Sequence, residues 1–349
     1  MKKKLAILLI GFYTSVFLTE EQSLFAAVPN LVSAPISAQS AILLDPRTNR
    51  VLYAKSPNRA RPAASTTKLM TALVVIDRLT LNHIVRVPQS AEYIPPTKVH
   101  LRMGERFYVK DLLKALLISS ANDAAHTLAL ACAGSEAHFA EFMNAKAKKL
   151  GARHTYFVNA SGLPYPSGQY TTAYDLALIM KEARKNQFIE NTLAQKFSRV
   201  KALTGRAVYL RSHNKMLWRT PHKVEGKTGF TRRALHCFVG KIKAPHRGDL
   251  VVAIMGSLRP WHDLVILLRL TRRLDPFQMQ FNRINLTSKE VAEVQKALTR
   301  LGFGPLPVNG LFGPHTLRTV KAFQKSRGLE TDGIVGSKTW ARLKSYRKG

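Results

Sequence analysis

Hydrophobic and polar positions along the chain predict a larger part built from strands and helices, followed by a smaller helical part. Apolar and β-branched runs predict strands at residues 41–45, 51–55, 206–210, 224–241 and 250–256. Apolar residues at helical spacing predict helices at residues 66–78, 109–133 and 261–274, the second broken into two at residues 119–123. Because strands flank the helices on both sides, we expect an α+β domain whose sheet joins distant parts of the chain.

The smaller part is predicted to be a three-helix bundle over residues 287–349, after a linker at residues 276–286. Thr287 to Glu290 has the pattern of a capping box that starts a helix. One apolar face of this helix is formed by Val291, Val294, Leu298 and Leu301. The sequence then repeats itself, because Asn309 to Thr316 matches Asp332 to Thr339, with turn residues before a helix in each copy. The predicted buried faces that follow are Leu317, Val320 and Phe323, then Trp340 and Leu343.

The N-terminus predicts export. Lys2 to Lys4 form a positive cluster, and residues 5–18 form an uncharged, largely apolar stretch, shorter than the ~20 residues of a membrane span. We expect a signal peptide over residues 1–27. The residue three positions before the expected cleavage site is large rather than small, so an uncleaved N-terminal anchor is the alternative. Either way, the bulk of the chain is predicted to lie in the periplasm, in the cell wall or at the extracytoplasmic face of the membrane.

The charge of the chain predicts anionic partners. It holds 54 Lys and Arg against 21 Asp and Glu, a formal net charge of +33. Such a field attracts polyanions, of which nucleic acid is the first to consider. The export signal and the lack of a nucleic-acid recognition motif argue against that partner. Outside the cytoplasm, the polyanions are phospholipid headgroups and the anionic polymers of the cell envelope.

Cysteine and histidine predict neither a disulfide framework nor a metal. Cys132 lies in a predicted helix and Cys237 in a predicted strand, so we expect two buried free thiols, with a single bridge left open. The eleven histidines show no zinc-ligand spacing. We therefore predict no metal and no cofactor.

Three short motifs carry the chemistry. They are Ser65-Thr66-Thr67-Lys68, Ser120-Ala121-Asn122 and Lys227-Thr228-Gly229. Alone, Ser65, Ser120 and Asn122 would ordinarily be capping or turn residues. In this order, the patterns S-x-x-K, S-x-N and K-T-G are the signature of serine acyltransferases that act on peptidoglycan peptides or β-lactams.

These residue types suit nucleophilic catalysis. A serine hydroxyl needs a base, and Ser65 and Lys68 share one face of a helix. Burial and a second cation, Lys227, would favour the neutral, basic form of Lys68. Ser120 can relay a proton to the leaving group, and Asn122 can hold a substrate amide. The backbone N–H groups of Ser65 and Phe230, the residue after Gly229, can stabilise an oxyanion.

With these motifs the chain resembles the D-alanyl-D-alanine carboxypeptidases, the low-molecular-mass penicillin-binding proteins of the S11 serine peptidase family. The likeness also includes Pro62 to Ala72, Asp111 to Ala125 and Ala160 to Pro164, and it covers residues 39–275. It implies a DD-peptidase/β-lactamase-like fold, an antiparallel sheet flanked by helices, and peptidoglycan stem peptides and β-lactams as ligands.

The resemblance also implies roles for single residues. Ser65 forms the acyl-enzyme, Lys68 accepts its proton, Ser120 assists, and Lys227 and Thr228 bind the terminal carboxylate. Arg232 or Arg233 could add to that carboxylate site, a choice left open because adjacent strand residues point to opposite faces. Leu235 stands where the family often has a glycine.

The C-terminal part resembles a peptidoglycan-binding module, through Phe312 to Thr316 and Phe323 to Leu329. Many family members instead carry a β-rich domain and an amphipathic membrane anchor. Retention at the wall is therefore expected to depend on the module and on the positive charge. The composition of the module would fit a purely structural bundle equally well.

Four other functions compete with the carboxypeptidase. A class A β-lactamase needs a glutamate after S-x-N, and no acidic residue lies between Glu141 and Asp175. An endopeptidase that cuts peptide cross-links would use the same residues and stays open. A non-catalytic wall-binding protein would not need three intact motifs. A nucleic-acid binder fits the charge only.

Overall fold

The computed structural model describes residues 35–219, 224–244, 248–273, 288–310, 312 and 314–345. The predicted signal peptide, the predicted linker and Thr287 of the predicted capping box lie outside these residues. Two compact units divide the chain, a larger one that reaches Leu268 and a smaller one at the C-terminal end.

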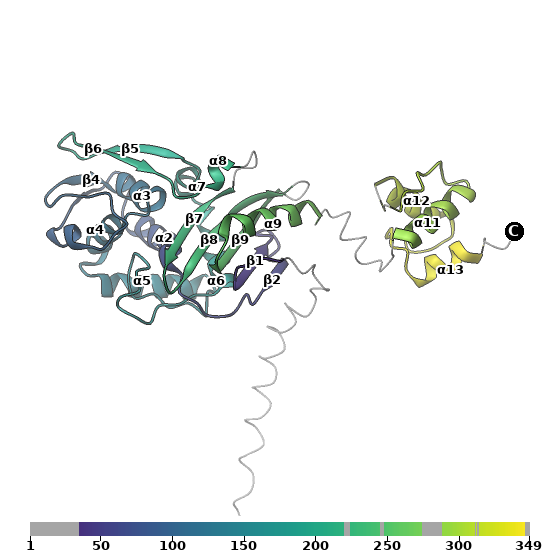
Figure 1. Cartoon of the computed structure of the whole chain (residues 1–349), viewed down its shortest axis with the longest axis horizontal. Helices are drawn as coiled ribbons and strands as arrows, with labels where there is room; N and C mark the ends of the chain where they lie inside the picture. The colour runs from purple at the N-terminus through teal and green to yellow at the C-terminus, as the bar shows by residue number, and fades with distance from the viewer. Residues whose placement is uncertain are drawn as a thin grey trace, which may run out of the picture. The chain divides into compact units, whose positions relative to one another are not determined.

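The larger unit is built on a five-stranded sheet with the order β2-β1-β9-β8-β7 (Figure 1). Its strands are β1 (Ser40–Leu44), β2 (Val51–Lys55), β7 (Val224–Thr231), β8 (Leu235–Ala244) and β9 (Gly248–Ser257). β1 pairs antiparallel with β2 and with β9. The first strand of the unit thus lies beside its last, and the prediction that the sheet joins distant parts of the chain is confirmed.

The segment predicted as one stretch of strand, residues 224–241, is a hairpin. β7 pairs antiparallel with β8 from Val224↔Ile242 to Thr231↔Leu235, and residues 232–234 form the turn. The expectation that Arg232 and Arg233 lie on a strand is therefore wrong. Leu235 begins β8 with a φ of 55°, a conformation that costs a non-glycine residue about 1–2 kcal/mol.

Helices cover both faces of the sheet and form a second layer beside it (Figure 1). They are η1 (Ala64–Thr67), α2 (Lys68–Arg78), η2 (Gln89–Tyr93), α3 (Val109–Ile118), α4 (Asn122–Ala133), α5 (Glu136–Lys149), α6 (Ala173–Ala183), α7 (Gln187–Leu193), α8 (Met216–Arg219) and α9 (Pro260–Arg273). Two small hairpins complete the unit, β3 (Ile84–Arg86) with β4 (Arg106–Tyr108) and β5 (Phe197–Lys201) with β6 (Ala207–Arg211).

The central strands are apolar on both sides because both faces of the sheet are covered. Ile42 of β1 and Ala253 of β9 belong to the main core with helix α2. Phe238 of β8 contacts Trp261 of α9, with ring centroids 6.4 Å apart. The start of α9 is held by Asp263, whose carboxylate accepts hydrogen bonds from Ser37 N and Ala38 N, each at 2.8 Å.

Helix α2 runs through the middle of the helical layer. Residues 68–75 are all buried, which is typical of a helix surrounded by other elements rather than packed on one side. η1, which directly precedes α2, packs against β7. The two motifs on these elements, S-x-x-K and K-T-G, are brought together by this contact.

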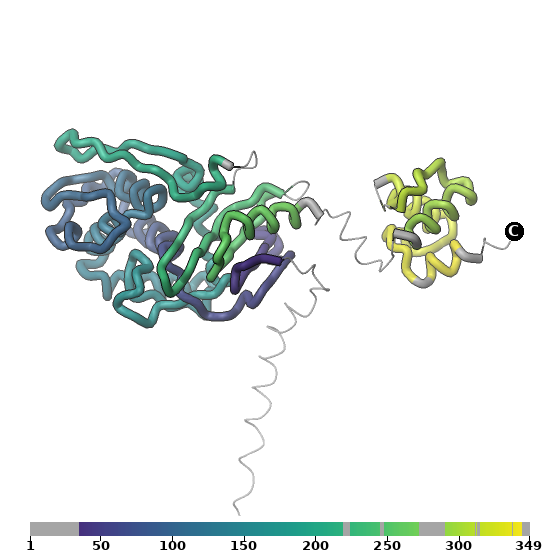
Figure 2. The backbone as a smooth tube through the Cα atoms, viewed as in Figure 1, coloured from purple at the N-terminus to yellow at the C-terminus, as the bar shows by residue number. Residues whose placement is uncertain are grey.

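The C-terminal unit contains α11 (Ser288–Arg300), α12 (Pro314–Ser326) and α13 (Ser337–Ser345) (Figure 2). Its core includes the predicted faces, with Val294, Val320 and Phe323 fully buried. The repeated sequence corresponds to a repeated contact. Gln295 accepts hydrogen bonds from Asn309 N and Gly310 N, and Gln324 accepts one from Gly333 N.

Two further predictions concern thiols and membrane spans. Both cysteines are free, but only Cys237 is buried, since Cys132 is half-exposed. Burial raises the pKa of both thiols to about 11, so neither is a ready nucleophile. Among the described residues, no helix combines the length and the apolar character that crossing a membrane requires.

Candidate active site

Ser65 and Lys68 meet at the junction of η1 and α2. Ser65 lies in a 3-10 turn that leads directly into α2, so residues 66 and 67 of the predicted helix belong to this turn. In such a turn, side chains three residues apart stand almost directly above one another. Lys68 Nζ accordingly donates a hydrogen bond to Ser65 Oγ at 2.9 Å, so the predicted contact between the two side chains is present.

Lys68 is a fully buried lysine with a complete set of acceptors. Besides Ser65 Oγ, its Nζ donates to Asn122 Oδ1 and to the backbone oxygen of Ser161, both at 2.7 Å. Burial, and secondarily the charge of Lys227, hold the pKa of Lys68 well below its usual range. The neutral form, which can accept a proton from a hydroxyl, is thereby favoured.

The S-A-N motif forms the corner between α3 and α4. Ser120 has a φ of 59°, a left-handed conformation that costs a non-glycine residue about 1–3 kcal/mol and is typical of functional sites. Its Oγ accepts a hydrogen bond from Lys227 Nζ at 2.9 Å. Asn122, the first residue of α4, donates from its side chain to Pro95 O at 3.0 Å while it contacts Lys68.

Lys227 is the second buried lysine. Its side chain is 1% exposed, and its Nζ donates to Ser120 Oγ and to Thr228 O. Burial lowers its pKa to about 7. The predicted second cation is therefore present, and it lies against the serine of the S-A-N motif.

Two glycines allow backbone to approach the Ser65 turn. A Cβ atom at Gly229 of β7 would lie 2.9 Å from Ser65 N, and one at Gly162 would lie 1.9 Å from Ala64 O. Only glycine permits such contacts. Gly229 thus brings β7, and with it Phe230, against the N–H group of Ser65. The side chain of Phe230 is largely exposed and stacks on His236.

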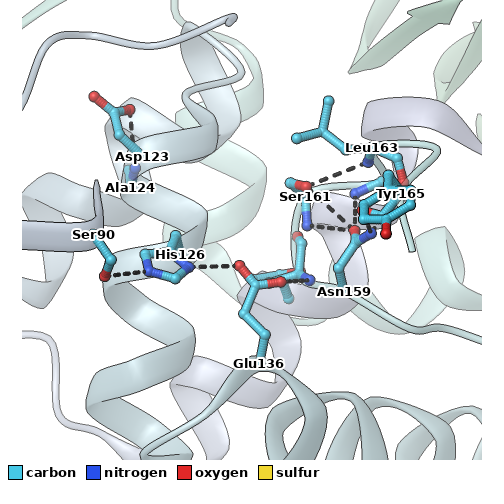
Figure 3. Close-up of polar contacts among 12 residues, drawn as sticks. Ser90, Asp123, Ala124, His126, Glu136, Asn159, Ser161, Leu163 and Tyr165 are labelled. Atoms are coloured by element: carbon cyan, nitrogen blue, oxygen red, sulfur yellow. Dashed lines mark hydrogen bonds and ion pairs between the residues drawn. The ribbon is translucent and has the colours of Figure 1, made fainter. Parts of the chain in front are cut away.

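The segment Ala160 to Pro164 is part of the likeness to the family, but no role in the site is predicted for it. In the structure, residues 159–163 lie against Lys68, since Ser161 O accepts a hydrogen bond from Lys68 Nζ. We call these five residues the wall behind Lys68. Asn159 organises this wall, because its Oδ1 accepts from Ser161 N and Gly162 N (Figure 3). Asn, Ser and Gly within four residues, as in Asn159-Ala160-Ser161-Gly162, are a turn signal, but nothing local indicates that the turn faces a lysine.

The group that faces Lys68 from this wall is a backbone carbonyl, not a carboxylate. A class A β-lactamase uses a glutamate to activate the deacylating water. No acidic residue lies in the wall itself, residues 159–163. Within the described part of the chain, no cluster of His, Cys, Asp or Glu could hold a metal ion.

A basic pocket of about 400 Å³ lies beside the site, lined in part by Ser119 and His213. Lys98, Arg206 and Arg211 also line it, although Arg206 is paired with Glu105. Ser119 directly precedes Ser120, so the pocket lies next to the S-A-N motif, and the pKa of His213 is lowered by burial and by the charges of Lys227 and Lys68. Arg232 and Arg233 lie in the β7–β8 turn, where both are exposed.

The chain is similar to known families over both of its units. The family model for D-alanyl-D-alanine carboxypeptidase, Peptidase S11, matches residues 27–258, and a peptidoglycan-binding domain model matches residues 287–343.

Three proteins illustrate the likeness. The D-alanyl-D-alanine carboxypeptidase DacF of Bacillus subtilis is 33% identical, covering 74% of this chain and 67% of its own. The D-alanyl-D-alanine endopeptidase of Escherichia coli is 34% identical, over 61% and 70%. The crystal structure of a D-alanyl-D-alanine carboxypeptidase from Mycobacterium tuberculosis superposes with a TM-score of 0.64 at 32% identity, covering 68% of this chain and 93% of that one.

Proposed function

Because the chain belongs to the D-alanyl-D-alanine carboxypeptidase family of serine peptidases, we propose that it removes the terminal D-alanine from peptidoglycan stem peptides. The observation that carries this proposal is the pair of buried lysines. Lys68 Nζ contacts Ser65 Oγ, and Lys227 Nζ contacts Ser120 Oγ, each at 2.9 Å. One lysine can act as the base, while the other lies where a substrate carboxylate would bind.

The reaction proceeds through an acyl-serine. Neutral Lys68 takes the proton of Ser65 Oγ, which attacks the carbonyl carbon of the penultimate D-alanine. The N–H groups of Ser65 and Phe230 stabilise the oxyanion. As the C–N bond breaks, the proton that Lys68 took from Ser65 is returned through Ser120 to the nitrogen of the departing D-alanine, whose carboxylate is held by Lys227 and Thr228. Water then hydrolyses the ester and regenerates Ser65. Penicillin would acylate the same oxygen through the C–N bond of its β-lactam ring.

Asn122 has two roles in this scheme. Its Oδ1 accepts from Lys68, which orients the base, and its Nδ2 donates to Pro95 O. Binding of a substrate amide would exchange one of these contacts. Gly229 acts through its lack of a side chain, which keeps β7 close to Ser65.

The predicted domain organisation completes the proposal. A signal peptide at residues 1–27 would export the enzyme, a catalytic domain would occupy residues 39–275, and the module at residues 287–349 would hold it on peptidoglycan. The charge of +33 would add attraction to anionic envelope polymers. Salt would weaken this electrostatic attraction more than it weakens the binding of the module to peptidoglycan.

An endopeptidase that cuts peptide cross-links is the second candidate. A relative at 34% identity is named D-alanyl-D-alanine endopeptidase, and the basic pocket beside Ser119 could receive a leaving group larger than alanine.

Mass spectrometry after incubation with a pentapeptide muropeptide, a cross-linked dimer and penicillin tests the proposal. We expect loss of one alanine and a penicilloyl adduct on Ser65, both absent in Ser65→Ala. An adduct with cleavage of the dimer alone would favour the endopeptidase. Neither adduct nor turnover would refute the enzymatic proposal and leave a wall-binding protein.

A further inference from the structure

A chain of hydrogen bonds runs behind the active site from η2 to the wall at residues 159–163. Ser90 Oγ lies 2.8 Å from His126 Nε2, and His126 Nδ1 lies 2.8 Å from Glu136 Oε1 (Figure 3). The other carboxylate oxygen of Glu136 accepts from Ala160 N at 3.3 Å. A carboxylate can only accept, so Nδ1 of His126 carries the hydrogen of the bond to Glu136, and Nε2 is the ring nitrogen that meets the Ser90 hydroxyl.

This chain connects the two segments that supply acceptors to Lys68. At one end, Ala160 precedes Ser161, whose carbonyl accepts from Lys68 Nζ. At the other end, Ser90 belongs to η2, and the segment after η2 holds Asn122 through the carbonyls of Pro95 and Thr97. Asn122 is the second acceptor of Lys68. Movement of either segment would therefore displace the base relative to Ser65.

Four charged or titratable groups interact electrostatically with Lys68. Lys227 of β7 and His213, between β6 and α8, are the basic ones, and Asp123 of α4 and Glu136 of α5 are acidic. The Asp123 carboxylate is committed to the backbone N–H groups of Val99 and Leu101. Glu136 is the acidic group that belongs to the hydrogen-bonded chain.

We propose that Glu136 is a positioning residue of the reaction, which holds the wall behind Lys68 through Ala160 and whose charge sets the pH range in which Lys68 accepts the Ser65 proton. His126 orients the carboxylate for both purposes. The inference rests on the proposed function, because it assigns Glu136 through its effect on the proposed base.

The sign of the effect follows from the charge. The negative charge of Glu136 favours the ammonium form of Lys68 and so raises its pKa, against the larger lowering by burial and by Lys227. Without that charge, the pKa of Lys68 falls further. A larger fraction of the lysine is then neutral at a given pH, and the acidic limb of the rate profile moves to lower pH.

The test is the pH profile of the second-order rate of acylation by a fluorescent penicillin, measured on the full chain. Glu136→Gln removes the charge and keeps an oxygen for Ala160 N, and its side-chain N–H can donate to His126 Nδ1 when the imidazole hydrogen moves to Nε2, which then donates to Ser90 Oγ. Glu141→Gln is the matched control, because Glu141 lies on the same helix and is exposed. His126→Lys opposes the charge by a second route, by placing an ammonium group beside Glu136, and serves if Glu136→Gln does not fold.

In Glu136→Gln and His126→Lys, but not in Glu141→Gln, we expect the acidic limb of the acylation profile to move to lower pH by roughly half a pH unit or more. A shift of this size is ordinary for one charge removed near a buried group. A folded Glu136→Gln that loses rate at all pH values with the limb unmoved would reduce Glu136 to a structural residue and overturn the proposal. An equal shift in Glu141→Gln would overturn it as well. Absence of acylation in the unmodified chain would instead refute the proposed function, and this inference with it.

Discussion

Gly229→Ala tests how closely β7 must approach the nucleophile. The added methyl would lie 2.9 Å from Ser65 N, 3.0 Å from Ala63 O and 3.1 Å from Ala64 Cβ, whereas ordinary contact begins at 3.4 Å. None of these atoms can rotate away, because all belong to the backbone or to the first carbon of a side chain. β7 and the Ser65 turn must therefore separate by a few tenths of an ångström.

The separation acts directly on the proposed oxyanion site. β7 is paired with β8 along its whole length, so its displacement is resisted and part of the shift falls on the Ser65 turn. Complete loss of one oxyanion donor costs about 2.7–4 kcal/mol, or ~10²–10³-fold in rate. For a partial displacement we expect a loss of roughly 10–100-fold, since misplacement by ~1 Å can cost ~10²-fold.

The assay is stopped-flow acylation by a fluorescent penicillin, with urea unfolding measured in parallel. Gly336→Ala is the control, because a methyl group there meets nothing within 4 Å and leaves the catalytic unit untouched. Acylation of a folded Gly229→Ala protein within about twofold of the unmodified rate would refute the reasoning, since the contact would then be irrelevant to the oxyanion site.

Three further predictions address the buried lysines and the C-terminal unit. The pKa of Lys227 is about 7 in the folded chain, against an ordinary value of 10.5, so the unfolded chain binds more protons between these two pH values. The free energy of unfolding, measured by urea titration, should therefore rise with pH in that window. The rise should be smaller in Lys227→Met, which lacks the titrating group. Asn122→Asp places a negative charge beside Lys68 Nζ, which raises the pKa of Lys68, so the acidic limb of the pH profile of acylation should move to higher pH. Asn122→Ala should only lose rate. A limb that moves to lower pH in Asn122→Asp would contradict our assignment of Lys68 as the base. Gln324→Leu removes the hydrogen bonds to Asp332, Gly333, Ile334 and Thr339. Each buried polar group left without a partner costs about 1–3 kcal/mol, so calorimetry should show that the C-terminal module unfolds before the catalytic unit. Co-sedimentation with peptidoglycan should then be lost, while acylation by penicillin is retained.

Local sequence determined the elements and the chemistry that they carry. The strands at β1, β2 and β9, the corner between α3 and α4, and the three C-terminal helices follow from apolar periodicity and turn residues, which depend on neighbours within a few positions. The contact between Ser65 and Lys68 is also local, since three residues of helix or 3-10 turn bring their side chains together. The order of the three motifs then indicated a serine acyltransferase.

Only the tertiary structure decided how the site works. Lys68 meets Asn122 and Ser161, and Lys227 meets Ser120, across large separations in sequence, and no periodicity specifies such pairs. The hairpin turn moved Arg232 and Arg233 off the strand, because antiparallel pairing of β7 with β8 ends at Thr231↔Leu235. Burial of both lysines is likewise a product of packing from several elements. Their lowered proton affinities, on which the proposed chemistry depends, come from desolvation, a property of the assembled interior and not of any one segment.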